Sequence, residues 1–157
     1  MEKRYVNING IRTLCNVPDS FLEEGEEEPM KVIYVAGPYR GKTKIDRNIN
    51  IETARAYGLA LWQNGFAAIT PHLNSIYMDD YISLTQEDYY AGDIAILRKC
   101  DGIFMIKGWK ESTGSVAEHK FAKENKIPIF YTMEEILKWK KRMRNVEESR
   151  PQPLKRR

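Results

Sequence analysis

Cysteine and histidine are scarce in this chain of 157 residues. Its two cysteines, Cys15 and Cys100, are too few for a disulfide framework, so we expect free thiols in a reducing compartment. The two histidines, His72 and His119, lie far apart, and no Cys/His cluster has the spacing of metal ligands. We therefore expect no metal site and a cytoplasmic protein.

Long apolar segments are also missing. No apolar run approaches the roughly 20 residues that a membrane-spanning helix needs, and no apolar stretch follows the charged N-terminus as it would in a secretion signal. With 42% hydrophobic and 30% charged residues, the composition is that of one soluble domain with a sizeable core.

The net charge of +3 hides a separation of charge between the two ends. Residues 1–29 carry seven acidic and three basic side chains, whereas residues 138–157 carry nine basic and two acidic ones. A basic end can bind nucleic acid, but no aromatic side chains for base stacking interrupt its final basic residues. We favour a solvated, disordered tail over 145–157 and regard nucleic acid as the less favoured partner.

The first 29 residues look like an accessory arm. Residues 5–8 and 11–14 have strand character, and Asn9-Gly10 between them is typical of a tight hairpin turn. The acidic stretch 19–29 ends in a proline and resembles a linker. We therefore predict a hairpin arm over 1–29 and the main domain over 30–144.

Within 30–144, short apolar segments alternate with segments of helical spacing, which predicts an α/β fold. We expect a flavodoxin/Rossmann-like three-layer sandwich with a mostly parallel sheet of four or five strands. The expected strands are 31–36, 66–70, 102–107 and 127–131, and the expected helices are 46–64, 85–99, 115–125 and 132–144. Ligands bind such sheets at the carboxyl ends of the strands, so loops 37–43, 71–84 and 108–115 should share one cleft.

The loop after the first strand joins two glycines to an arginine, a lysine and a threonine at the start of a helix, as anion-binding loops do. It is not a Walker A loop, because Gly37 and Gly41 have three residues between them instead of four. A Walker B aspartate would end its strand, whereas Asp101 precedes one. A smaller phosphate cradle remains, although two glycines alone are also plain turn chemistry.

Two acidic residues are expected to face the same cleft. Asp93 lies on the edge of a helical apolar stripe, and Glu118 ends the pattern Ser112-x-Gly114-x-x-x-Glu118 in the first turns of the next helix. Taken singly, Glu118 is also explained as an ordinary glutamate in a first helical turn, and Asp93 as one member of a buried structural pair. Together they suit glycosyl transfer, in which one carboxylate attacks and the other manages the leaving group.

The ordered set Val35-Ala-Gly-Pro-Tyr-Arg-Gly41, Pro71-His72, Gly92-Asp93, Cys100-Asp101 and Ser112-x-Gly114-x-x-x-Glu118 resembles the nucleoside 2-deoxyribosyltransferase superfamily, over about 30–131. The nearest resemblance is to its small phage and bacterial members and to 2′-deoxynucleoside 5′-phosphate N-hydrolases.

This resemblance implies that Glu118 is the nucleophile and that Asp93 assists the departing base. It also implies no cofactor and a homodimer or higher homo-oligomer. The residues that would bind the 5′-phosphate are Gly37, Tyr39, Arg40, Gly41, Ser112 and Gly114.

Serine at position 112 favours a phosphorylated substrate, because transferases for free nucleosides tend to have an acid there. One departure is the longer loop 107–111, which adds Glu111 as a rival carboxylate.

His72, Asn74 and Trp109 are candidates for contact with the base, although strand capping or packing explains them as well. We therefore expect an enzyme that releases the base from a 2′-deoxynucleoside 5′-monophosphate. The alternatives are base exchange between free nucleosides and a nucleotide-binding module without turnover.

Overall fold

The computed structural model describes residues 2–8, 11–17, 30–78 and 84–148. Strands β1 (Glu2–Ile8) and β2 (Ile11–Val17) pair antiparallel in a two-stranded sheet of their own. This confirms the predicted hairpin, with strands that extend further from the turn than expected. The Asn9-Gly10 turn and the predicted acidic linker lie outside the described residues.

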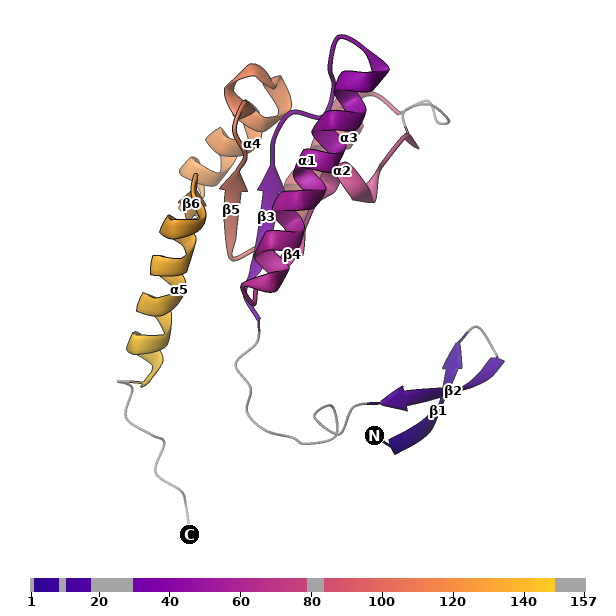
Figure 1. Ribbon diagram of the computed structural model, residues 1–157. Helices are drawn as coiled ribbons and strands as arrows, with labels where there is room; N and C mark the ends of the chain where they lie inside the picture. Colours follow the sequence, from indigo (N-terminus) through magenta and orange to yellow (C-terminus); the bar gives the residue numbers. More distant parts are fainter. Residues whose placement is uncertain (1, 9–10, 18–29, 79–83, 149–157) are drawn as a thin grey trace.

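The main sheet has four parallel strands in the order β4-β3-β5-β6 (Figure 1). They are β3 (Val32–Ala36), β4 (Ala67–Ile69), β5 (Gly102–Met105) and β6 (Ile129–Phe130). The chain moves from β3 to β4 on one side and then crosses to β5 on the other. Crevices at such a change of direction are where parallel sheets bind ligands.

Helices cover both faces of the sheet, which confirms the predicted α/β three-layer architecture (Figure 1). Helices α1 (Lys44–Gln63) and α5 (Met133–Glu148) bury Ala54, Leu61 and Ile136 against one face. Helices α3 (Gln86–Leu97) and α4 (Thr113–Glu124) bury Leu97 and Ala122 against the other. Because both faces are covered, β3 and β5 are apolar along their whole length.

Local hydrogen bonds fix where the helices begin. The predicted capping box at Thr85 is present, since its side chain accepts from the Asp88 amide while the Asp88 carboxylate accepts from the Thr85 amide. The box predicted at Thr132 forms in the same way with Glu135. An unpredicted third box at Thr43 starts α1 two residues earlier than expected.

The loops contain more helix than predicted. A short helix α2 (Pro71–Asn74) follows β4, because proline is favourable in a first helical turn. A 3₁₀ turn, η3 (Trp109–Glu111), precedes α4. Helix α5 continues to Glu148, so residues 145–148 of the predicted tail are helical, while 79–83 and 149–157 lie outside the described residues. Nowhere in the described ranges does a helix combine the length and apolarity that a bilayer span requires.

Candidate active site

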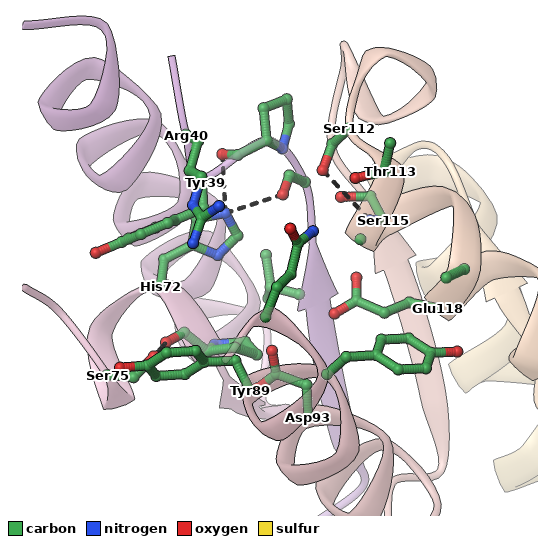
Figure 2. Close-up of a pocket in the computed structure, with 18 of the residues that line it drawn as sticks. Tyr39, Arg40, His72, Ser75, Tyr89, Asp93, Ser112, Thr113, Ser115 and Glu118 are labelled. Atoms are coloured by element: carbon green, nitrogen blue, oxygen red, sulfur yellow. Dashed lines mark hydrogen bonds between the residues drawn. The ribbon is translucent and has the colours of Figure 1, made fainter. Parts of the chain in front are cut away.

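A cavity of about 520 Å³ opens at the carboxyl edge of the sheet. Its wall draws on all three loops that were expected to share a cleft, together with α3 and the first turns of α4. Figure 2 shows Tyr39, Arg40 and His72 on one side of the pocket and Ser112 to Glu118 on the other, with α3 along the bottom.

Glu118 is the most buried acidic group of this pocket. Its side chain is 8% exposed, and the Tyr34 hydroxyl donates a hydrogen bond of 2.6 Å to its Oε1. The pKa of Glu118 is raised to about 8, chiefly by burial; the bond from Tyr34 opposes this rise, and the negative charge of Asp93 adds to it. Burial and the two acids raise the pKa of Tyr34 well above its usual value, so its hydroxyl stays a donor.

Tyr34 was not among the site residues predicted from the sequence. The sequence feature that could have pointed to it is a tyrosine in an otherwise aliphatic strand. A buried phenol needs a hydrogen-bond partner, so such a tyrosine indicates a polar group nearby. That partner is 84 residues away in the chain.

Asp93 lies on α3 and lines the same pocket. Its partial burial raises its pKa to about 6. The negative charge of Asp93 helps to raise the pKa of Glu118, so the two carboxyl groups interact electrostatically across the pocket. The structure thus brings together the two acids that the sequence placed at one cleft.

The raised pKa of Glu118 predicts a pH-dependent cost to stability. Between about pH 4.5 and 8 the folded state holds a proton that the unfolded state has lost, so stability falls as pH rises. Glu118→Gln should therefore raise the free energy of unfolding by about 4 kcal/mol at pH 8 and by less than about 1 kcal/mol at pH 5. Urea unfolding of wild type and variant at both pH values measures this difference.

Glu111→Gln is the matched control, because Glu111 is an exposed acid of the same pocket. It should leave the pH dependence of stability unchanged. A Glu118→Gln variant whose stability followed that of the wild type at both pH values would contradict the buried, protonated state of Glu118.

Two glycines let the loop 37–41 pass close to its neighbours. A Cβ at Gly37 would clash with the Ile106 side chain, and one at Gly41 would clash with the Cβ of Asp46. Neither position has room for a side chain. The glycines predicted for the phosphate cradle are thus needed for packing, and Gly37 also lines the pocket.

Side chains from α1 and α2 hold the carbonyl groups of this loop. His72 Nε2 lies 3.1 Å from the oxygen of Gly37 and 3.0 Å from that of Pro38. The Asn50 amide nitrogen donates to the oxygens of residues 39 and 40, at 3.3 and 3.1 Å. Four successive carbonyls are therefore fixed by the protein itself, so the loop is preorganised for a ligand.

The surroundings of His72 define its tautomer. Carbonyl oxygens only accept, so Nε2 carries the proton and Nδ1 is a bare acceptor. Burial lowers the pKa of His72, which keeps the ring neutral. His72 lines the pocket at the position predicted for base contact, and its ring also fastens the loop.

The N-terminus of α4 forms the opposite wall. Ser112 is its N-cap and accepts a hydrogen bond of 3.3 Å from the Ser115 amide. Ser112 and Gly114, both predicted for phosphate binding, line the pocket, as do Tyr39 and Arg40 across from them. A helix N-terminus opposite an arginine is a favourable place for an anion.

Three buried polar atoms of the pocket residues have no hydrogen-bond partner within the described part of the chain. They are the Oγ of Ser115, the hydroxyl of Tyr89 and Nδ1 of His72. Buried polar groups are usually satisfied, so this set fits a pocket for a polar ligand. Neither Ser115 nor Tyr89 is a predicted site residue, because Ser115 was expected only to begin a helix and Tyr89 to serve in packing.

Two predicted base contacts are not brought into the pocket. Asn74 is exposed at the end of α2 and does not line the cavity. Trp109 stacks on His119 at 4.4 Å and packs against the core cluster beneath α4, so it has a packing role. The rival acid Glu111 does line the pocket.

The charge of the pocket is predominantly negative. Among the described lining residues, Arg40 is the one permanent cation, beside the acids Glu87, Asp93, Glu111 and Glu118. No group of three or more His, Cys, Asp or Glu side chains in the described ranges could hold a metal ion. The chemistry available at this pocket is that of paired carboxyl groups, a phenol and an anion cradle.

Comparison with known proteins agrees with the extent of this domain. No curated protein matches the chain significantly. The model of a family described as a domain of unknown function, DUF4406, matches residues 31–131, from the start of β3 to just beyond β6. The matched segment contains both carboxylates, the loop and the start of α4, and the chain therefore belongs to the DUF4406 family.

Proposed function

We propose that this protein cleaves the N-glycosidic bond of a 2′-deoxynucleoside 5′-monophosphate and releases the free base. The observation that carries the proposal is the buried Glu118 carboxyl, held by Tyr34 and electrostatically coupled to Asp93 at one pocket. The resemblance of the ordered motifs to nucleoside 2-deoxyribosyltransferases supports the same assignment.

In the first step, an Oε atom of ionised Glu118 attacks C1′ of the deoxyribose. The C1′–N bond breaks, its electron pair stays with the base, and protonated Asp93 supplies a proton to that base. Tyr34 donates to one carboxylate oxygen of Glu118 and so orients the group. The product is a glycosyl ester on Glu118 together with the free base.

In the second step, water attacks C1′ of the ester from the side that the base has left. Asp93, now ionised, accepts a proton from this water, and the C1′–O bond to Glu118 breaks. The sugar phosphate leaves with its original configuration at C1′, because two inversions have occurred. At the end of the cycle Asp93 holds a proton again and Glu118 is again ionised.

The 5′-phosphate would lie between Arg40 and the start of α4. Arg40 offers a forked, permanently charged donor, and the Ser112 hydroxyl can donate without the repulsion that an acid would exert. The fixed carbonyls of residues 37–40 keep this cradle in place. Binding the phosphate there would position C1′ against Glu118 and lower the entropic cost of reaction.

The carboxyl pair predicts a bell-shaped dependence of kcat/KM on pH. Below about pH 6 both groups hold protons and Glu118 cannot attack, whereas above about pH 8 neither can protonate the base. Between these values the prevailing form has its proton on Glu118, and the reactive form, with the proton on Asp93 and Glu118 ionised, is a minor one whose population also peaks near pH 7. Initial rates between pH 5 and 9 should therefore fall on both sides of about pH 7, and a rate that rose steadily to pH 9 would contradict a carboxyl acid.

A substrate panel tests the function directly. The protein is incubated with the four common 2′-deoxynucleoside 5′-monophosphates, the matching nucleosides and the ribonucleotides, and free base is measured by chromatography. Release of base and deoxyribose 5-phosphate from a deoxynucleotide is the expected result. Tight binding without release over hours would replace the proposal with a nucleotide-binding module.

The negative pocket favours one alternative, base exchange between free nucleosides. A single arginine among four acids binds a dianionic phosphate less well than it would in a neutral site. In this alternative a second base attacks the glycosyl ester in place of water. Exchange of a labelled base into an unphosphorylated nucleoside, without net release, would identify this activity.

A further inference from the structure

The outward side of α1 carries an exposed apolar stripe whose residues do not line the candidate active site. Ile45, Ile49 and Leu59 are 71%, 58% and 57% exposed, and exposed Ala56 lies between the last two. These positions fall on one side of a helix. No other labelled element covers this side of α1 (Figure 1). Contiguous apolar surface of this kind marks an interaction site.

The stripe contains a groove with the geometry of helix packing. Its lining residues are Ile45, Asn48, Ile49, Glu52, Thr53 and Ala56. They form two overlapping diamonds with the spacing i, i+3, i+4, i+7, which is the hole that receives one side chain of a facing helix. The small side chains of Thr53 and Ala56 also let a neighbouring helix approach closely. The occupant that this groove fits is therefore a helix.

We propose that the occupant is α1 of a second copy of this chain, packed antiparallel across a two-fold axis near residues 53–54. The exposed Leu59 of each copy then reaches the groove between Ile45 and Glu52 of the other. Each helix thus supplies both a protruding apolar side chain and the hollow that receives it, as a two-fold interface requires.

Charge complementarity at the centre of the stripe supports a second copy. Glu52 and Arg55 form an ion pair of 3.1 Å within one helix. In the antiparallel arrangement, Glu52 of one copy lies opposite Arg55 of the other, so four alternating charges meet at the axis. A parallel arrangement would set like charges against one another. This inference does not depend on the proposed reaction.

The mass of the full chain in solution tests the interface. Light scattering of the wild type should give at least twice the 18.3 kDa chain mass, and Ile49→Asp should halve the mass measured for the wild type. We expect the dissociation constant to rise about 100-fold, because the substitution places a charge in the apolar groove of both copies. Leu137→Asp, at an exposed apolar site on α5, should leave the mass unchanged.

Charge reversal distinguishes a second copy from any other occupant. Glu52→Arg and Arg55→Glu should each weaken association, because each variant sets like charges across the axis. A one-to-one mixture of the two variants should associate again, since every charge then faces its opposite in the mixed dimer. In the mixture, each chain still lacks the ion pair between positions 52 and 55 of its own helix. Only contact between the two copies therefore explains this recovery.

Three results would overturn the inference. They are a wild-type chain of single mass, an Ile49→Asp variant with the wild-type mass, and a mixture of charge variants that stays dissociated. The first would assign the groove to a helix of another protein. Circular dichroism confirms folding of each variant, and the exposed positions chosen should keep the fold intact.

Discussion

Glu118→Gln is expected to lower the rate of base release by about 10⁴-fold or more while the nucleotide still binds. The amide has nearly the shape of the carboxyl group, and its oxygen can still accept the hydrogen bond from Tyr34. It cannot, however, form the glycosyl ester. Single-turnover rates with a deoxynucleotide and calorimetric binding of the same nucleotide measure the two quantities separately.

Glu111→Gln is the control for this experiment, because Glu111 is the rival carboxylate of the same pocket and is exposed. Its rate should stay within about threefold of the wild type, as expected for a surface acid outside the reaction. If Glu111→Gln abolished base release while Glu118→Gln remained active, the nucleophile would be Glu111 and the mechanism proposed above would be wrong.

Arg40→Ala is expected to raise KM for deoxynucleotides by about 100-fold and KM for the matching nucleosides by less than about threefold. The guanidinium is the one permanent cation among the described lining residues. Hydrogen bonds to charged groups contribute roughly 1.5–3 kcal/mol each, which is about 10- to 100-fold in binding. Steady-state kinetics on each nucleotide and its nucleoside give the ratio.

Lys42→Ala is the matched control for Arg40→Ala. Lys42 is an exposed cation two residues further along the chain, and it does not line the pocket. Its removal lowers the net charge by the same one unit as Arg40→Ala does, but it should leave the ratio of the two KM values unchanged. Equal effects of Arg40→Ala on nucleotides and nucleosides would remove the argument for a phosphate at this loop.

The architecture could be predicted from the sequence because its determinants are local. A strand buried on both faces is continuously apolar, and the boxes at Thr85 and Thr132 need only residues three positions apart. The parallel sheet then follows from the alternation of strands and helices. The shared cleft follows in turn, because parallel strands end at the same edge.

The contacts within the site could not be predicted, because they join residues far apart in the chain. The bond from Tyr34 to Glu118 spans 84 positions, and the bond from His72 to the loop spans 35. The sequence alone is compatible with Trp109 either in the pocket or in the core. Its stacking on His119 depends on how η3 turns into α4, which no local pattern specifies.

The central strand β3 connects the two proposed parts of the site. Tyr34 holds the nucleophile, and three residues later Gly37 opens the cradle, about 10 Å along an extended chain. Because side chains alternate along a strand, one inserted residue would turn the Tyr34 hydroxyl to the opposite face of the sheet. The number of residues between Tyr34 and Gly37 therefore sets the distance between the proposed phosphate site and the nucleophile.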